Sequence, residues 1–373
     1  MISSKKTLRQ GNSQRRIFFL LGGVILFSLC SLQAAEWLNP GYRYRQRITI
    51  SDGFYVTGAD LKNFPLLIHL SDEQNPVFQK GKPDGSDLTF TTSDGKSKIP
   101  HELEKFSVSP AQLVCWVRLP FLYADQQTVI YLYYGNSNPP DPLPAESVWS
   151  EGYLGVWHFQ DNTSLDTRPV TIKNSTGKGL AGKAPGNFIA LGKFNQGTAT
   201  SVSFTRQEGP DFTPETSFTA EAWVYCQEIP FRTTLSVLGK GSGGRGWSLY
   251  WHEAGRWQAN ITQDYRQENT RFYLMSPDSP WQKWRYLTVT YEALERKMRL
   301  FVDGLEKAAG RIPDGIKDFS VSSSFSIGGI RGVIDEVRLS SVARSPDWIA
   351  TCAKNQSSPG RYIRFSLEEK FAR

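Results

Sequence analysis

The chain has 373 residues, of which 39% are hydrophobic and 21% charged, and this composition excludes a disordered or fibrous protein. The length predicts about two or three domains. The formal net charge of +7 suggests a polyanionic partner, but five basic residues precede position 17 and the first acid is Glu36. The remaining 38 basic and 36 acidic side chains nearly balance, so we exclude nucleic acid as a partner.

The N-terminus has the pattern of an export signal. Residues 1–16 are basic, residues 17–32 read IFFLLGGVILFSLCSL, and Ala34 and Ala35 follow. This order predicts a secretory signal peptide over residues 1–35. Because the apolar run approaches the length of a membrane span, an uncleaved N-terminal anchor is the alternative. We expect an exported protein, periplasmic or at the cell surface, by a route that the sequence leaves open.

Residues 36–137 alternate short apolar runs with turn-forming residues, which predicts a β-rich domain. The predicted strands are 42–50, 64–70, 87–91, 112–119 and 127–134. Both alternating faces of 127–134 are apolar, so we predict that this strand is buried on both sides. Residues 138–144 read NPPDPLP and predict an extended linker over 138–150.

The strand pattern resumes over residues 151–367, and 368–373 form a C-terminal tail. The predicted strands are 153–159, 217–225, 247–252, 257–262, 285–291, 297–302 and 332–339. Asp303-Gly304 predicts a hairpin after 297–302. Ser345, followed by Pro346 and Asp347, predicts the start of a short helix. So many short strands are typical of a β-sandwich or jelly roll.

Five segments of the second half occur in the order of a known pattern. They are GVWHF at 155–159, SFTAEAWV at 217–224, LFVDG at 300–304, IGG at 327–329 and GVIDEVRLS at 332–340. Residues 151–350 thereby resemble a LamG-like jelly roll of the concanavalin A-like lectin/glucanase superfamily. The resemblance implies an all-β chain, with an N-terminal β-sandwich-like domain followed by a concanavalin A-like jelly roll.

The first half resembles an uncharacterised bacterial domain of unknown function. The resemblance is carried by YRQRITI at 44–50, GSDLTF at 85–90 and YLYYGN at 131–136. Members of that family often accompany LamG-like domains, and some are fused to MotA/TolQ/ExbB-type channel subunits. An ExbB/TolQ-like transport assembly is therefore one candidate partner.

The sequence does not offer a recognisable catalytic motif. None of the four histidines forms His-x-His or His-Glu-x-x-His, and the Glu-x-Asp-x-x-Glu spacing of related glycosidases is absent. Asp335 and Glu336 are adjacent, so regular strand alternation would direct them to opposite faces. We predict a non-catalytic protein and keep a carbohydrate-active enzyme as the weaker alternative.

Jelly rolls of this kind often carry one calcium ion, so the resemblance implies a calcium site. Calcium takes about six to eight oxygen ligands. The candidates are Asp161, Asp166 and Asn174, after the first strand of the second half, and Asp335 in the C-terminal motif. The alternative is that these residues form turns by bonding their own backbone.

Aromatic residues make up 13% of the chain and crowd residues 247–284. Alternation places Trp247, Leu249 and Trp251 on a core face, which leaves the opposite face for recognition. A sugar needs a flat apolar platform and a few polar groups. The candidate ligand-binding residues are Tyr250, His252, Tyr265, Arg266 and Tyr273. We therefore expect a binding protein of the bacterial cell envelope that recognises carbohydrate or protein.

Three cysteines remain after the predicted signal. In an oxidising compartment, Cys226 and Cys352 are the only pair within one predicted domain, so they are the candidate disulfide. The alternative, which we favour slightly, is that these two and Cys115 are small buried side chains.

Overall fold

The computed structural model describes residues 35–372 except 52–57, 150, 162–168, 187–188, 206–208, 229–232, 243 and 278–280. The predicted signal or anchor therefore lies outside the described residues, apart from Ala35. Within the described ranges, none of the helices is both long and apolar enough to cross a membrane. The described chain consists mainly of antiparallel strands, which confirms the all-β class.

Two sheets build the first half. One has the order β24-β1-β7-β3-β4, with β25 also paired to β1, and the other has the order β2-β6-β5. The elements contributed by this half are β1 (Tyr44–Ile50), β2 (Leu61–Leu70), α1 (Val77–Lys80), β3 (Thr89–Thr92), β4 (Lys98–Ile99), β5 (His101–Val108), β6 (Ala111–Leu122), β7 (Thr128–Tyr134) and the 3-10 helix η1 (Ala145–Trp149). As predicted, β7 is buried on both sides: Ile130 and Leu132 lie in the main core, whereas Tyr131 and Tyr133 pack against Tyr42.

Two larger sheets form the jelly roll, in the orders β18-β17-β16-β15-β22-β13-β10-β9 and β11-β12-β23-β14-β19-β20-β21, with β8 on β23. The strands are β8 (Tyr153–Trp157), β9 (Val170–Ile172), β10 (Gly182–Ala184), β11 (Ile189–Leu191), β12 (Gln196–Thr198), β13 (Val202–Ser203), β14 (Phe218–Cys226), β15 (Leu235–Ser242), β16 (Arg245–His252), β17 (Arg256–Thr262), β18 (Arg271–Met275), β19 (Trp284–Glu292), β20 (Lys297–Val302), β21 (Leu305–Arg311), β22 (Phe325–Ile327) and β23 (Gly332–Ser340). The 3-10 turn η2 (Glu268–Thr270) precedes β18.

Local signals for the hairpin and the helix are confirmed. Asp303 and Gly304 have φ values of 55° and 80° in the turn between β20 and β21, as a two-residue hairpin turn of type I′ requires. Ser345 caps α2 (Pro346–Ser357), because its Oγ accepts a hydrogen bond from the Trp348 N–H at 3.2 Å.

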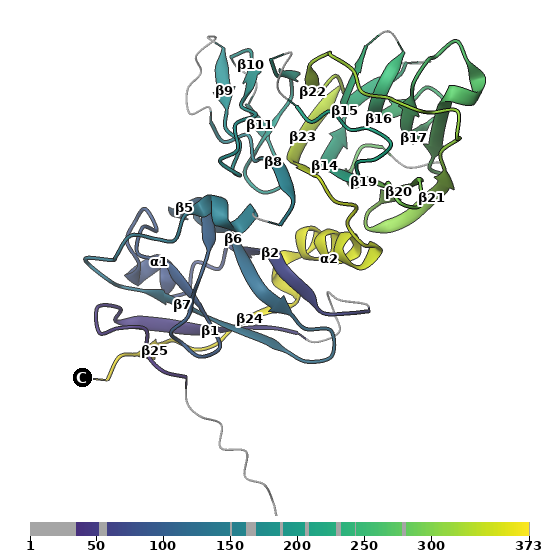
Figure 1. Ribbon diagram of the computed structural model, residues 1–373. Helices are drawn as coiled ribbons and strands as arrows, with labels where there is room; N and C mark the ends of the chain where they lie inside the picture. Colours follow the sequence, from purple (N-terminus) through teal and green to yellow (C-terminus); the bar gives the residue numbers. More distant parts are fainter. Residues whose placement is uncertain are drawn as a thin grey trace, which may run out of the picture. The chain divides into compact units, whose positions relative to one another are not determined.

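The C-terminal segment belongs to the first half rather than to the jelly roll or to a free tail. After the 3-10 turn η3 (Pro359–Arg361), strands β24 (Ile363–Phe365) and β25 (Glu369–Lys370) pair antiparallel with β1, and Figure 1 shows this yellow segment beside the purple strand. This corrects the predicted division into 151–367 and 368–373. The physical reason is that β1 would otherwise present an open sheet edge with unpaired backbone groups.

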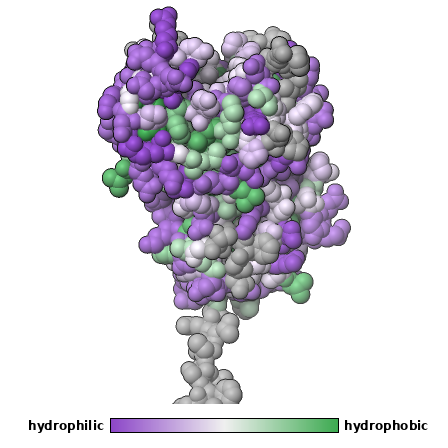
Figure 2. All heavy atoms as spheres, turned by 90° about the vertical axis from the view of Figure 1, so that its right-hand side faces the viewer, coloured by the Kyte–Doolittle hydropathy of each residue, from purple (hydrophilic) through white to green (hydrophobic). Residues whose placement is uncertain are grey.

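A shared hydrophobic core joins the two halves. Leu66 and Trp116 of the first half lie in the same cluster as Trp223 and Tyr286 of the jelly roll. The predicted linker contributes as well, because η1 buries Trp149 in this core. Residues 35–373 accordingly form one compact unit. On the face drawn in Figure 2, hydrophilic residues dominate and hydrophobic ones gather in a patch in the upper part.

The three described cysteines are buried and free. Cys226 lies in the jelly-roll core and Cys352 in the shared core, so the predicted Cys226–Cys352 disulfide is wrong and the alternative of small buried side chains is confirmed. Burial raises the pKa of the Cys226 thiol to about 11, which keeps it protonated at neutral pH.

Candidate functional site

The β15–β18 sheet presents a polar and aromatic face away from its core. Trp247, Leu249 and Trp251 point inward and are 3%, 0% and 2% exposed, as alternation predicts. The other side of β16, β17 and β18 forms what we call the outer face. Its members are Ser248, Tyr250, His252, Arg256, Gln258, Asn260, Thr262, Arg271, Tyr273 and Met275.

The strand register arranges these side chains in rows across the sheet. Ser248 pairs with Asn260, and Asn260 pairs in turn with Tyr273. The Ser248 Oγ donates to Asn260 Oδ1 at 2.5 Å, and Asn260 Nδ2 donates to Thr262 Oγ1 at 3.4 Å. A hydroxyl, an amide and a phenol therefore lie side by side on regular strands.

A pocket of about 280 Å³ opens beside this row, between the β15–β16 hairpin, Ser248, Asn260 and Tyr265. Gly244 has φ 79°, and a Cβ there would lie 2.5 Å from the Tyr265 Cβ, so glycine is needed for this close approach. Tyr265 is 65% exposed and Tyr273 is 57% exposed. Both rings are therefore available to a ligand.

The predicted binding residues have unequal places on this surface. Tyr250 and Tyr273 share the outer face, and Tyr265 lines the pocket. His252 is only half-exposed, and its Nδ1 accepts the Ala254 N–H at 3.0 Å in the following turn. Arg266 lies exposed in the loop between β17 and β18.

Tyr250 is partly buried and accepts a hydrogen bond from Gln258 Nε2. Burial, followed by the influence of Tyr273, raises the pKa of the Tyr250 phenol to about 12, so the hydroxyl stays neutral. Sequence reasoning missed Ser248, Asn260 and Thr262. Strand alternation could have found them, since each is two residues from another outer-face position.

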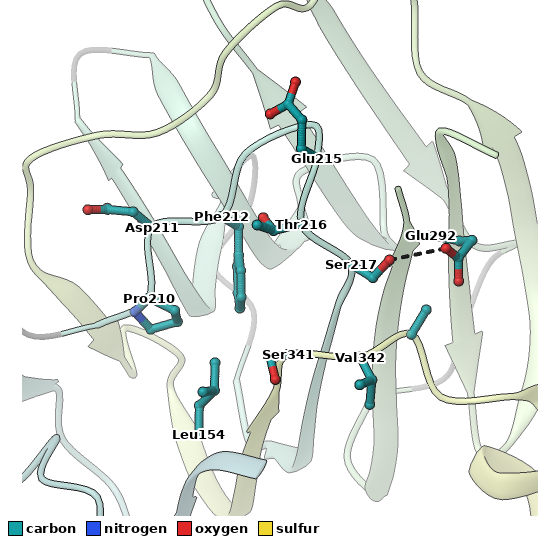
Figure 3. A pocket seen from close by; sticks show the side chains of 11 residues that line it. Leu154, Pro210, Asp211, Phe212, Glu215, Thr216, Ser217, Glu292, Ser341 and Val342 are labelled. Carbon is teal, nitrogen blue, oxygen red and sulfur yellow. Dashed lines mark hydrogen bonds between the residues drawn. The ribbon is translucent and has the colours of Figure 1, made fainter. Parts of the chain in front are cut away.

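A larger pocket of about 640 Å³ lies elsewhere on the jelly roll (Figure 3). Leu154 and Phe212 point toward each other there, whereas the carboxylates of Asp211 and Glu215 point away from the pocket. Glu292 accepts a hydrogen bond from Ser217 Oγ at 3.1 Å. The side chains drawn in Figure 3 thus do not present a convergent pair of carboxylates, which glycoside hydrolysis needs.

The predicted calcium ligands are used for other contacts where they are described. The single side-chain oxygen of Asn174 accepts from Val156 N, Thr176 N and Thr176 Oγ1 at 3.0–3.1 Å, so Asn174 does not fit a ligand role. Asp161 Oδ2 accepts the Lys173 N–H at 3.0 Å. The two oxygens of Asp335 accept the N–H groups of Lys193 and Glu336, and Asp166 lies outside the described residues. Calcium stays a prediction.

A charged cluster lies buried between the first half and the jelly roll, and sequence reasoning missed it. We call it the seam cluster. Its members are Glu102, Glu104, His158, Asp335, Glu336 and Arg338.

The prediction that Asp335 and Glu336 face opposite sides is wrong, because both carboxyls lie in the seam cluster, where they repel each other and both act on His158. The reason is a β-bulge in β23: residues 336 and 337 together oppose the single residue 222 of β14, and Glu336 has φ 53°.

The pKa values of the seam cluster move in opposite directions. Burial, followed by repulsion from Glu336, raises the pKa of the Glu104 and Asp335 carboxyls well above their usual range. Burial opposes the charged ring of His158, but Glu336 and Glu102 outweigh it and raise the pKa of His158. Burial likewise opposes ionisation of Glu336, yet His158 and Arg338 lower its pKa. A His158–Glu336–Arg338 ion network is therefore maintained inside the protein.

Comparisons with known proteins agree with this architecture. Residues 196–350 match the family described as the concanavalin A-like lectin/glucanases superfamily, and residues 84–168 match a domain of unknown function, DUF2341. No curated protein matches the chain.

Similar solved structures include the binding domain of Paraclostridial Mosquitocidal Protein 1, at 12% identity and a TM-score of 0.45, covering 54% of this chain and 52% of that one. The receptor binding domain of botulinum neurotoxin D follows, at 13% identity and a TM-score of 0.42, covering 55% of this chain and 53% of that one. A Trypanosoma rangeli sialidase is 15% identical with a TM-score of 0.42, covering 65% of this chain and 43% of that one. The chain thus spans about half the length of the first of these structures. The resemblances expected from the sequence are thus confirmed, since residues 196–350 are similar to the concanavalin A-like lectin/glucanases superfamily and residues 84–168 to DUF2341.

Proposed function

We propose that this protein is an exported, non-catalytic binding protein of the bacterial cell envelope that recognises carbohydrate through the outer face of its jelly roll. The observation that carries the proposal is the row Ser248–Asn260–Tyr273 beside the pocket that Tyr265 lines. Amide and hydroxyl groups bond sugar hydroxyls, while an exposed ring stacks on the apolar face of a sugar. The match of residues 196–350 to a superfamily that includes lectins supports the same ligand class.

The charge of this surface limits the class of glycan that it can bind. None of the ten outer-face residues is acidic, and Arg271 places a guanidinium 5.7 Å from the centre of the Tyr265 ring. We therefore expect neutral or acidic glycans to bind better than cationic ones. An accessory role beside an ExbB/TolQ-like assembly is the second candidate function, because only the resemblance of the first half supports it.

The test is a glycan array probed with the full protein, followed by calorimetry with the best ligand. We expect Asn260→Ala and the double variant Tyr265→Ala/Tyr273→Ala each to weaken binding by about tenfold or more, equal to about 1.4 kcal/mol. Phe121→Ala is the matched control, since Phe121 is an aromatic 42% exposed on β6 of the first half.

Three results would contradict the proposal. Unchanged affinity in both outer-face variants would show that the glycan binds at another surface of the protein. Loss of binding in Phe121→Ala would assign it to the first half. Release of shorter glycans during incubation would identify an enzyme rather than a binding protein.

A further inference from the structure

Three side chains of the seam cluster converge on one point. Glu104 from β5, His158 after β8 and Glu336 from β23 each place one donor atom within 4.8 Å of the other two. The His158 Nδ1 lies 2.6 Å from Glu336 Oε1 and 3.7 Å from Glu104 Oε2. The side chains of Glu104, His158 and Glu336 are 1%, 6% and 0% exposed.

Each of these side chains is positioned by irregular backbone. Glu104 is the extra residue of a bulge in β5, since the pairing with β6 shifts between Leu103 and Lys105. Glu336 has φ 53° in the bulge of β23, and Phe159, directly after His158, has φ 57°. Bulges redirect side chains, and strained non-glycine residues persist where the surrounding structure requires them.

The far nitrogen of His158 is directed at a second carboxylate. His158 Nε2 is buried without a hydrogen bond of normal geometry, although Glu102 Oε2 lies 3.4 Å away. Glu102 is itself fixed, because it accepts from Trp149 Nε1 at 2.5 Å and from Ser175 Oγ at 2.7 Å. A carboxylate behind the second ring nitrogen is the usual way in which proteins orient a metal-binding histidine.

The charges of the seam cluster leave room for a cation. Glu102, Glu104, Asp335 and Glu336 supply four carboxyl groups, whereas His158 and Arg338 are its two basic members. Buried charges are costly unless they are neutralised or paired. As metal ligands, Glu104 and Glu336 are charged and His158 is neutral, so a divalent ion together with Arg338 would balance these two carboxylates and that of Glu102.

We propose that Glu104, His158 and Glu336 bind a divalent transition-metal ion of the Zn²⁺ type, which fastens the first half of the protein to the jelly roll. One imidazole and two carboxylates are ligands that Zn²⁺ accepts. Bonds of about 2.0 Å in a tetrahedral site separate the donors by roughly 3.3 Å, and the observed 2.6 and 3.7 Å lie on either side of that value. Because all three ligands are buried, the ion is structural. The inference is independent of carbohydrate binding.

The first experiment measures metal in the purified protein by mass spectrometry. The protein is then unfolded in guanidinium with a chelator and refolded with or without Zn²⁺. We expect about one ion per chain and a Tm higher by about 5 °C or more after refolding with Zn²⁺. Less than about a tenth of an ion per chain, together with a Tm that Zn²⁺ does not change, would overturn the proposal.

Glu104→Gln separates a metal site from a purely ionic cluster. The variant keeps an oxygen to accept the Trp116 Nε1–H, which is 3.0 Å from Glu104 Oε2, but removes the charge. With a metal site, the variant loses the ion and melts at a lower temperature than the wild type. Without one, it removes a repelling carboxyl and melts at the same or a higher temperature, which would refute the site.

Glu221→Gln is the matched control. Glu221 is also fully buried and accepts the Tyr286 hydroxyl at 2.5 Å, which glutamine can still do, but it is not among the three converging ligands. The control must retain the ion. Equal metal loss in both variants would show that the effect comes from general loosening of the core and would overturn the assignment of ligands.

Discussion

The seam cluster and the outer face differ in the burial and the charge of their polar side chains. In the seam cluster, ionisable groups are buried on bulged or strained backbone, and Arg338 packs against both Trp116 and Trp149, with its Cζ 4.3 and 5.0 Å from the ring centres. On the outer face, the polar groups are mostly neutral, lie on regular strands and border exposed rings such as Tyr265.

This difference indicates that one region stabilises the fold and that the other is available for ligand binding. A buried charge is strongly destabilising once its partner is removed, so the seam cluster fixes how the two halves fit together. An exposed neutral group costs little to lose, so the outer face is free to serve a ligand. Substitutions should therefore change stability in one region and binding in the other.

The largest loss of stability is expected from Arg338→Met. Arg338 is fully buried and its Nη2 donates to Glu336 Oε2 at 2.8 Å. Removing it leaves a buried carboxylate without its cation, which should lower the free energy of unfolding by about 3–5 kcal/mol in urea titrations. Arg299→Met is the control, because its pair with Glu306 is partly exposed and worth about 0–1 kcal/mol. If both variants lost the same free energy of unfolding, the buried ion pair would be no more important for stability than the partly exposed one.

A second loss is expected where α2 meets β2. The Asn355 side chain accepts the Leu67 N–H at 2.8 Å and donates to the Leu67 carbonyl at 3.0 Å, all in the protein interior. Asn355→Leu leaves both backbone groups unsatisfied and should cost about 2–4 kcal/mol, measured by urea unfolding. Lys354→Leu, at the neighbouring, less buried position, controls for the new leucine. If the free energy of unfolding of Asn355→Leu equalled that of the wild type, this contact would not stabilise the docking of α2.

Sequence signals predicted the features that depend on near neighbours. Asp303-Gly304 and Ser345-Pro346 were sufficient to place the hairpin and the helix start, because turns and caps are set by a few adjacent residues. Pairing of β24 with β1 joins residues more than 300 positions apart, and alternation assumes regular strands, so it could not show that bulges bury Glu104 and Glu336. The exposure of Tyr273 was predictable because β18 is a regular strand.

Acid should weaken the first half through His101. Burial lowers the pKa of His101 to about 4, against about 6.5 in an unfolded chain. Between these values the unfolded chain binds more protons, so stability is lost as pH falls from about 6.5 to 4, by up to about 3 kcal/mol. We expect the free energies of unfolding of the wild type and His101→Gln, measured by urea titration across this range, to approach each other as the pH falls toward 4. Parallel curves for the wild type and His101→Gln would refute the assignment.

The smallest change in stability is expected on the outer face. Tyr265→Ala and Tyr273→Ala remove rings that are 65% and 57% exposed, so each should alter the free energy of unfolding by less than about 0.5 kcal/mol. The same urea titrations measure this, with Trp251→Ala as the opposite control, since that ring projects from the neighbouring strand face into the core and is 2% exposed. A loss above about 1 kcal/mol for either tyrosine would mean that the ring is part of the framework. Any loss of glycan binding in that variant would then reflect altered structure rather than a missing contact.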